Sequence, residues 1–525
     1  MPALSPMRLQ DYEPLSAAEK KLVADCATGG RVTIGDGAMP EAESDAVVIR
    51  AGLIRLLLTG GEPGLALHDK GLRLRGAWIS GTLDLQGADI SADISLTACR
   101  LGDPVEMVNA RLRGLFFSGC ALAGVSGDNA RLDGALFLRA GTVVSGEISL
   151  AGARIAGDLQ LCDVEITSPG QDAVFAPSIE VEGSVFLGNY PYGNGETSLV
   201  CDGAVFMASA NVGHDVFVTH TAVSPKSELE GGAVFQGSEE HGVDNALSLA
   251  RARIGGILYL ANNQISRGTV SLAGASAARY RDEPEGPGAG YDLRLDGFTY
   301  DDFSRHADAS VKARLKWLER RPKDTPFTAQ PYEQLARVLS HLGHRSDARA
   351  VLMRKERILR RENRKSMTNP VTKAVLWLHD SVMRVAVGYG YRPGQILVFA
   401  VLLILGLGVF FQKTWAAGDM TPNAAPVLIS QDWLAATQSY PDNPGAFWAS
   451  KGQAGQDWET FQGFAYAADV VIPIVSLGQE SAWAPSTSRS PWGQAGWWLR
   501  WFAKAAGWII TALGAAAVTG AVRND

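Results

Sequence analysis

Aliphatic residues recur at a short, fixed interval between about residues 70 and 300, and this repetition constrains the fold more than any other feature. Leu83 and Ile94 lie eleven residues apart, and so do Ile148 and Leu159. In a short strand, residues i and i+2 point to the same side, while small or turn-forming residues occupy the corners. One apolar row cannot be buried alone, but stacked rows shelter one another. The interval predicts a β-solenoid over residues 70–300, with two units and about 22 residues per coil.

The corners of the repeat carry a short motif, seen as GADI at residues 87–90 and as NARL at 109–112 and 129–132. The chain contains 58 glycines without a collagen triplet, which favours a turn-rich β architecture. The motif resembles the A-[DN]-[LF]-x-x unit of pentapeptide-repeat and related β-helical proteins, in which the central aliphatic residue points inward. This resemblance implies a right-handed β-helix.

The first 69 residues are predicted to form a helical cap on the solenoid. Ser16 precedes AAEKKLVADCA and Glu19 follows three positions later, which is the spacing of a capping box. A second helix is expected from about Ser44 to Leu58. A cap of this kind would cover the open strand edges of the first coil.

The periodicity weakens after residue 168. The segments SPGQDAVFAPS and YPYGNGETS are expected there as lateral loops, which makes them candidate binding edges on the solenoid.

Residues 301–366 are predicted to form a basic helical hairpin. Helices are expected from Tyr332 to Leu342 and from Ser346 to Lys365, joined at Gly343. The hairpin is interpreted as a packing or capping element rather than a peptide-binding repeat. Residues 367–393 are amphipathic and are expected to lie along a membrane interface as an elbow, with a buried soluble helix as the alternative.

Two transmembrane helices are predicted near the C-terminus, over residues 394–413 and 494–525. Gly394 to Phe411 contains no charged residue and has almost the length needed to cross a bilayer. The second span is expected to begin near Ala505, after an interfacial belt of Trp497, Trp498 and Trp501. Three residues of this second helix are expected at a helix-packing face, against the first helix or a second copy of the chain, namely Gly514, Ala516 and Gly520.

The distribution of charge predicts the orientation. The net charge is −7, yet residues 301–392 carry roughly twice as many basic as acidic side chains. The loop over residues 414–493 contains only Lys451 and Arg489 as basic residues. No apolar segment follows the first residues, so no signal peptide is expected. The positive-inside rule then predicts a bacterial inner-membrane protein with its head and both termini in the cytoplasm. Six basic residues are expected to face lipid, namely Arg354, Arg357, Arg360, Arg361, Arg364 and Lys365.

Between the two predicted spans, residues 461–483 form an apolar stretch that is only marginally long enough to cross a membrane. It is interpreted either as a re-entrant segment or as an extracytoplasmic helix that packs on the membrane. In the re-entrant interpretation its polar and turn residues would be functional, namely Asp469, Pro473, Gly478, Gln479, Glu480 and Trp483.

The C-terminal third resembles a bacterial family of uncharacterised membrane-associated proteins, some of which carry a loose oxidoreductase label. The resemblance lies in PYEQLARVLSHLGHRSDARAVLMRKE, VGYGYRPG, IPIVSLGQESAW and GWIITALGAAAVTGAVR. It implies a β-helical head on a two-helix anchor and supplies no catalytic residues.

No sequence motif indicates a cofactor, a metal site or nucleic-acid binding. The GPGAG at residues 286–290 lacks the context of a dinucleotide-binding turn, and VGYG at 387–390 precedes the first span instead of following a pore helix. The five cysteines are far apart and are interpreted as packing thiols. His341 and His344 have no evident third ligand and are interpreted as surface residues.

We therefore predict a non-enzymatic membrane scaffold or sensor whose solenoid presents a surface to a protein partner. A small channel formed by oligomerised helices is the alternative, and a membrane-associated oxidoreductase ranks third.

Overall fold

The computed structural model describes residues 8–60, 62, 64–193, 195, 197–219, 233–236, 245–283, 291–323, 325–387 and 394–518. The chain divides into two compact units, Met1–Leu352 and Met353–Asp525.

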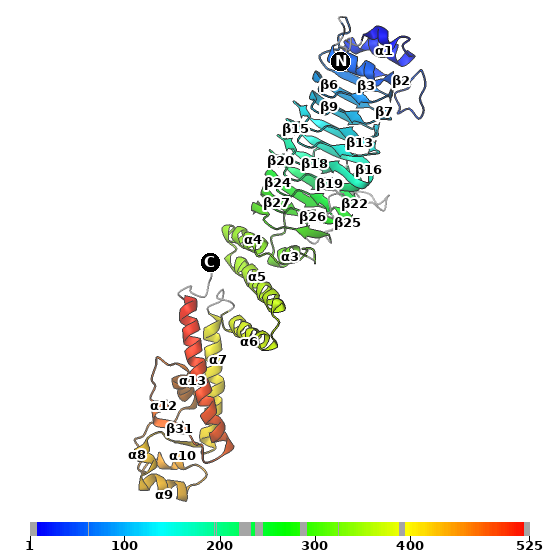
Figure 1. The fold of residues 1–525 in the computed structure, drawn as a ribbon. Coiled ribbons are helices and arrows are strands. Elements are labelled where there is room, and N and C mark those ends of the chain that lie inside the picture. The colour runs from blue at the N-terminus through cyan, green and yellow to red at the C-terminus, as the bar shows by residue number, and fades with distance from the viewer. Residues whose placement is uncertain are drawn as a thin grey trace. The chain divides into compact units, whose positions relative to one another are not determined.

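The first unit is built on a β-solenoid of about eight turns, which confirms the predicted fold (Figure 1). Leu72 pairs with Ile94, Ile94 with Leu115 and Leu115 with Leu136, so one turn takes 21 or 22 residues, as the two-unit coil predicts. Its strands pair in parallel, and those of the first half are β1 (Val32–Thr33), β2 (Val48–Arg50), β3 (Leu72–Arg75), β4 (Trp78–Ser80), β5 (Leu83–Asp84), β6 (Asp89–Thr97), β7 (Arg100–Leu101), β8 (Val105–Glu106), β9 (Arg111–Ser118), β10 (Ala121–Leu122), β11 (Val125–Ser126), β12 (Arg131–Leu132), β13 (Leu136–Val144), β14 (Ile148–Ser149) and β15 (Arg154–Ile155). Those of the second half are β16 (Leu159–Phe175), β17 (Glu180–Val181), β18 (Val185–Gly188), β19 (Leu199–Phe206), β20 (Asn211–Val212), β21 (Val216–Thr219), β22 (Ala233–Gln236), β23 (Asn245–Ser248), β24 (Arg253–Ala261), β25 (Gln264–Arg267), β26 (Thr269–Ser271), β27 (Ser276–Asp282), β28 (Asp292–Arg294) and β29 (Thr299–Phe303).

The core of the solenoid consists of inward columns of apolar side chains, four of which serve as examples. Each turn adds one strand segment to each column, and residues at the same height in neighbouring turns stack directly. Three successive members of the columns are Ile94, Leu115 and Leu136; Leu101, Leu122 and Val144; Val105, Val125 and Ile148; and Leu112, Leu132 and Ile155. All of them are buried, so the apolar repeat of the sequence is the repeat of this core.

The GADI and NARL motifs mark the same corner in three successive turns. Gly87, Asn109 and Asn129 hold positive φ angles of 62°, 55° and 57°, which glycine and asparagine tolerate best. The alanine that follows each of them is buried, the next residue points outward, and the aliphatic residue after it enters the core. Because these turns bend at the same point, the columns stay aligned.

The turns lengthen in the second half of the stack. Leu159 pairs with Val185, Val185 with Val216, and Val216 with Leu258, so the spacing between paired residues rises to 26, 31 and 42 residues while the column continues. YPYGNGETS lies between β18 and β19, as the lateral loop predicts. The prediction for SPGQDAVFAPS was wrong, because most of it belongs to β16, where Ala173 and Val174 are buried.

The N-terminal cap contains η1 (Leu9–Tyr12), α1 (Ala17–Asp25), η2 (Cys26–Thr28) and α2 (Ala51–Thr59). The capping box is confirmed, since Glu19 N donates to Ser16 Oγ and Ser16 N donates to Glu19 Oε2, both at 3.0 Å. The helix expected from Ser44 begins only at Ala51. Val48–Arg50 forms β2 and pairs with β4, because pairing to the first full turn satisfies its backbone.

Helices cover the other end of the solenoid. They are α3 (Val311–Leu318) and α4 (Gln330–His341), and α5 (Arg345–Ser366) follows after a turn at Gly343. The Gln334 amide donates to the Tyr300 carbonyl at 2.6 Å, and the Gln330 amide donates to the Phe298 carbonyl at 3.0 Å, which joins α4 to the last turn.

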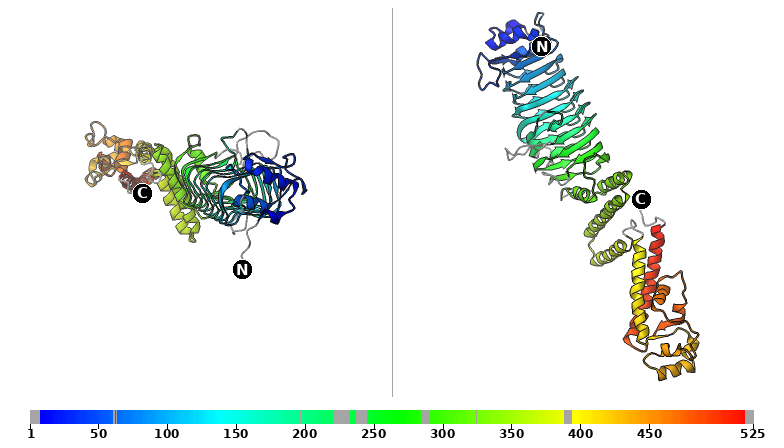
Figure 2. Two further views of the ribbon diagram at one scale, coloured as in Figure 1. Left: turned by 90° about the horizontal axis from the view of Figure 1, so that it is seen from above. Right: turned by 180° about the vertical axis from the view of Figure 1, so that it is seen from behind.

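The second unit is a helical hairpin with a small lobe. Its elements are α6 (Pro370–Val387), α7 (Gln395–Ala416), β30 (Met420–Pro422), α8 (Ala425–Leu428), α9 (Gln431–Ser439), α10 (Pro444–Trp448), α11 (Gly463–Val471), α12 (Gln479–Ala482), β31 (Trp483–Pro485) and α13 (Pro491–Val518). Helices α7 and α13 run side by side in opposite directions (Figure 2). The Phe410 and Trp492 rings meet near one end, while Ile396 packs against Ile510 and Leu513 near the other.

Only one of the two predicted membrane spans is found among the described residues. Helix α7, Gln395–Ala416, is long and apolar enough to cross a membrane. Helix α13 is continuous over 28 residues but carries Arg500 and Lys504 in its middle, which lowers its apolar character. The sequence GPGAG at 286–290, most of VGYG and residue Gly520 lie outside the described residues.

Candidate functional site

The outer surface of α7 is apolar and exposed. Only 22% of the most apolar 18-residue stretch of α7 is buried, whereas the core helix of a soluble protein is mostly buried. The exposed apolar side chains of this helix are Leu397, Val398, Phe399, Val401, Leu402, Leu405 and Val409. Such a continuous apolar surface is rare on a soluble protein and marks a contact with lipid or another protein.

Helix α13 extends this surface and has two different sides. Trp498, Trp501 and Phe502 are exposed, as are Trp508 and Ile509 further along the helix. Trp497 is half-buried, with its ring edge against Trp498. The three tryptophans expected at an interface therefore lie together near the start of α13, and two of them point outward. We call the exposed apolar surface of α7 and α13 the apolar belt.

Arg500 and Lys504 of α13 line a cavity of about 400 Å³. Lys504 also borders the belt, since its Nζ lies 5.8 Å from the centroid of the Trp501 ring. Glu480 of α12 accepts from Arg500 at 2.7 Å and from Lys504 at 2.5 Å, and both basic residues line the cavity. Arg500 and Lys504 are one helical turn apart, so a single carboxylate reaches both. This pairing neutralises one of the two positive charges of the helix.

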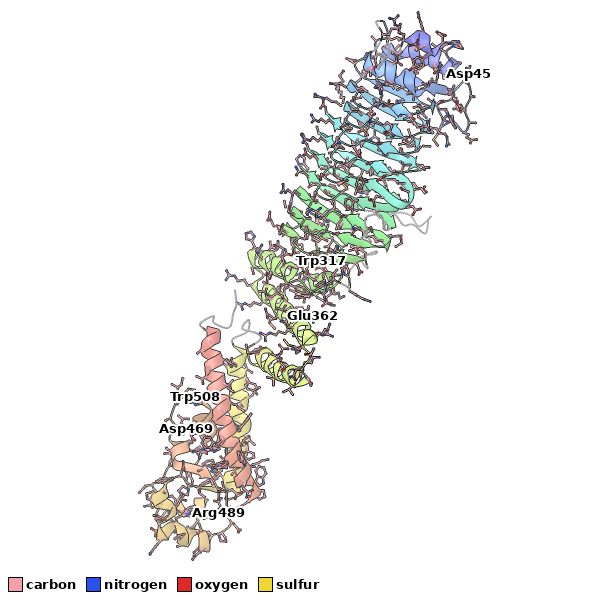
Figure 3. The ribbon with its side chains drawn as sticks, in the orientation of Figure 1. Asp45, Trp317, Glu362, Asp469, Arg489 and Trp508 are labelled. Atoms are coloured by element: carbon pink, nitrogen blue, oxygen red, sulfur yellow. The ribbon has the colours of Figure 1, made fainter. Side chains whose placement is uncertain are left out.

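Asp469 fixes the loop that forms the other wall of the cavity. It lies near the end of α11, and its carboxylate accepts from Leu477 N at 2.8 Å and from Glu480 N at 2.7 Å. Asp469 and Trp508, which both line the cavity, are labelled in Figure 3. The loop that joins α11 to α12 exposes Ile474 and Leu477, so its tip is apolar. Its base is held by the charged carboxylate of Asp469.

The six residues singled out in the segment 461–483 all lie in or next to this loop. Pro473 lines the cavity, and Gly478 precedes α12 with a φ of 80°. The Gln479 amide donates to Glu459 Oε1 at 2.9 Å, and Trp483 Nε1 donates to the Glu459 carbonyl at 2.7 Å. The segment thus forms two short helices and a loop against α7 and α13. Its partners Arg500 and Lys504 were missed as site residues, because nothing in the sequence links them to Glu480.

The six basic residues expected to face lipid all lie on α5, and the structure separates them into two groups. Arg364 forms an ion pair with Asp380 of α6 at 2.6 Å, and Arg360 lies 3.7 Å from the same carboxylate. The side chains of Arg357, Arg361 and Lys365 are exposed at a spacing of four residues, and Arg354 is half-buried. The first group joins α5 to α6, and the second forms a positively charged stripe.

The helix-packing prediction identified the correct helix, but the closest contacts lie elsewhere. Gly514 lies beside Ile396 of α7, at an ordinary packing distance, and Ala516 lies two residues further along. The tighter contact is at Gly507, where an added Cβ would overlap the carbonyl of Val471 in α11. Helix α13 therefore uses a glycine to approach α11, a contact that sequence spacing did not indicate.

The solenoid carries an aromatic cluster on one outer face. Phe186 and Phe217 stack on neighbouring turns with ring centroids 5.1 Å apart, and the Arg281 guanidinium lies 4.0 Å from the centroid of Tyr259 on the next turn. From the lateral loop, Tyr190 and Tyr192 pack edge-on against Phe186, and Tyr192 is 70% exposed. Tyrosine and arginine are frequent anchors in protein interfaces.

Within the described parts of the chain, no group of three or more His, Cys, Asp or Glu side chains is arranged to hold a metal ion. The five cysteines are buried and unpaired. Burial raises the pKa of the Cys162 thiol to about 12, so it stays protonated at neutral pH. These observations agree with thiols that pack in the core.

The fold and this site define a β-solenoid protein with an exposed apolar helix and a charged cavity beside it. Comparison with protein-family models, with curated proteins and with solved structures finds no match for this chain.

Proposed function

We propose that this chain is an integral membrane scaffold, in which the α7 and α13 hairpin anchors a β-solenoid that binds a protein partner. The apolar belt carries this proposal. A 22-residue helix is about 33 Å long, enough to cross the hydrocarbon of a bilayer. Its exposed side chains are aliphatic and aromatic, as contact with lipid requires.

Helix α13 is proposed as the second span. Charged residues in membrane helices usually face the protein and pair with one another. Arg500 and Lys504 do so, since both contact Glu480, while the aromatic residues of the same helix point outward. The resulting two-helix anchor, the right-handed sense of the coil and the kinship with pentapeptide-repeat proteins are parts of this proposal. The coil sense and the kinship are supported by the repeated corner motif.

Membrane retention tests the anchor. Replacing Leu402, which is exposed in the middle of α7, by arginine should reduce insertion, because a central arginine costs about 2.5–3.5 kcal/mol on insertion scales. We expect Leu402→Arg to appear in the soluble or aggregated fraction after an alkaline carbonate wash. The matched control is Tyr192→Arg on the solenoid, which should remain in the membrane. Quantitative extraction of the unaltered chain by carbonate would refute the proposal.

The proposed orientation places the head and both termini in the cytoplasm of a bacterial cell, with the lobe between α7 and α13 outside. The basic residues before α7 support it, since the lobe contains only Lys451 and Arg489. An impermeant thiol reagent should label Ala454→Cys in intact spheroplasts and Tyr192→Cys only after permeabilisation. The reverse pattern would invert the topology.

The aromatic cluster around Tyr192 is the proposed partner surface. A photo-crosslinker at position 192 should give a discrete adduct in cells, and Phe217→Ala should abolish it because the stacked platform is lost. A crosslinker at Arg131, which is exposed elsewhere on the solenoid, is the control. Equal adducts from both positions would argue against a specific surface.

A small channel is the second candidate, and the charged cavity supports it. The cavity is lined by Asp469, Glu480, Arg500 and Lys504 beside a proposed span, where ionisable groups often mark a transport path. Ion flux through liposomes containing the purified oligomer tests this function, and tight liposomes would exclude it. A bound flavin or haem in the absorption spectrum would instead support the third-ranked oxidoreductase.

A further inference from the structure

The N-terminal half of α6 exposes large apolar side chains. Val371, Val375 and Trp377 are 68%, 61% and 61% exposed, and Met367 just before the helix is exposed as well. Val371 and Val375 are one turn apart, so they share one side of the helix. Asp380, which pairs with Arg364, lies on the opposite side and joins α6 to α5. The side that carries Val371 and Val375 therefore faces away from α5, while Trp377 projects from a different side of the helix.

This exposed surface is continuous with the proposed membrane anchor. Met383 of α6 packs against Ile396 at the start of α7, and Ile510 and Leu513 near the end of α13 pack against the same Ile396. The C-terminal end of α6 thus lies beside the start of α7, at one end of the apolar belt. A helix at that position meets the boundary between acyl chains and headgroups rather than the centre of a bilayer.

The charges next to this surface are positive. Arg357, Arg361 and Lys365 form an exposed stripe on α5. Lys365 also lies 2.9 Å from Glu362, which leaves the stripe with a net positive charge. An amphipathic helix bordered by such residues binds anionic lipid more strongly than neutral lipid, because each cation near the surface gains electrostatic attraction.

We infer that α6 is an in-plane lipid-binding helix, whose apolar side enters the bilayer surface while the basic stripe selects anionic phospholipids. This inference rests on the proposed membrane anchor and adds the ligand class and the binding surface. The apolar side of α6 makes contact with the lipid, and α5 lies above it, held by the ion pair of Arg364 and Asp380.

Depth-dependent quenching of a fluorophore tests the inference. The five native cysteines are buried, so a thiol-reactive fluorophore on the full-length protein should react at an introduced exposed cysteine. Val375→Cys carries the probe on the apolar side. Lys373→Cys lies about 160° around the helix and is the matched control. A third probe at Leu402→Cys reports on the membrane span. The protein is placed in nanodiscs of phosphatidylcholine with or without phosphatidylglycerol, and lipids with shallow or deep nitroxide groups serve as quenchers.

We expect the shallow quencher to act on the Val375→Cys probe severalfold more than on the Lys373→Cys probe, and the deep quencher to act mainly at position 402. Phosphatidylglycerol carrying the nitroxide should quench position 375 more than labelled phosphatidylcholine does. Replacing both Arg357 and Arg361 by glutamine should lower the apparent affinity for the anionic lipid by roughly thirtyfold.

Each contrary result has a separate meaning. Quenching at 402 without quenching at 375 would overturn the inference while leaving the anchor intact. Absence of quenching at 402 and 375 would refute the anchor itself. Equal quenching of position 375 by both lipid classes, unchanged by the double substitution, would overturn the assignment of anionic lipid.

Discussion

The end of the solenoid contains a buried ion pair whose removal should have a pH-dependent cost. Arg314 of α3 lies 2.7 Å from Asp282 of β27, and the two side chains are 0% and 3% exposed. The guanidinium also lies 4.3 Å from the centre of the Phe303 ring. Replacing Arg314 by methionine keeps a similar volume but leaves the carboxyl without its counter-charge. Removing one member of a buried pair destabilises by about 3–5 kcal/mol.

The pH dependence follows from the carboxyl that is left behind. Burial raises the pKa of Asp282 above its ordinary value, and Arg314 is the main influence that opposes this rise. Without Arg314 the pKa rises further. A group with a raised folded-state pKa stabilises the fold below its ordinary pKa, and that contribution is lost as the pH rises through the folded-state pKa. We therefore expect the penalty of Arg314→Met to be small near pH 4 and full at pH 7.

Hydrogen exchange of the full-length protein measures this effect where it occurs. Amides of β27, β29 and α3 should exchange about a hundredfold to several thousandfold faster in Arg314→Met at pH 7, after correction for the intrinsic rates. The central turns should be unaffected, because repeat units contact only their neighbours. The double variant Asp282→Asn/Arg314→Met should recover most of the protection at every pH. The same penalty at pH 4 and pH 7, or a double variant no better than the single one, would refute the reasoning.

Three further predictions concern other parts of the chain. Burial alone raises the pKa of Glu19, but hydrogen bonds from Arg50 and from Ser16 N lower it overall. The N-terminal cap should therefore lose stability as the pH falls below about 4.5. Glu19→Gln should remove this pH dependence, as measured by hydrogen exchange of α1 during an acid titration. Glu480→Gln should destabilise the second unit by about 1.5–3 kcal/mol, because Arg500 and Lys504 lose the negative charge with which both are paired. Thermal unfolding in detergent checks this, and exposed Asp457→Asn is the control that should show no change. Asn129→Val should destabilise the solenoid by roughly 1–2 kcal/mol, because a β-branched residue disfavours the left-handed φ of 57° at this position. Asn129→Gly should be tolerated. Equal stability of the two variants in urea unfolding would contradict this prediction.

The parts of the fold that sequence predicts are those where local chemistry and packing agree. Leu83 and Ile94, eleven residues apart in the sequence, both belong to columns of the core, since Leu83 pairs with Val105 and Ile94 with Leu115. The capping box of Ser16 and Glu19 also forms as its spacing indicates. Val48 illustrates the opposite case. Its spacing to Leu53 and Ile54 suits a helix, but tertiary pairing with β4 makes it a strand.

The candidate site was predictable only in part. The polar residues of the segment 461–483 were identified because charge in an apolar stretch is unusual. Their partners were not, since Glu480 and Arg500 are twenty residues apart and meet only through the packing of α11, α12 and α13. The same pairing accounts for the two charges within the otherwise apolar helix α13, because both are matched by Glu480 inside the second unit.

The unequal length of the coils has a practical consequence. Val216 and Leu258 are neighbours in one column although 41 residues separate them, while Leu258 and Tyr280 are neighbours across a much shorter coil. The stacking of the column is therefore compatible with coils of very different length. An epitope tag or a small reporter domain inserted into the loop that carries Tyr192 should leave the pairing of the remaining strands unchanged. This loop is therefore a suitable place to insert a new binding segment.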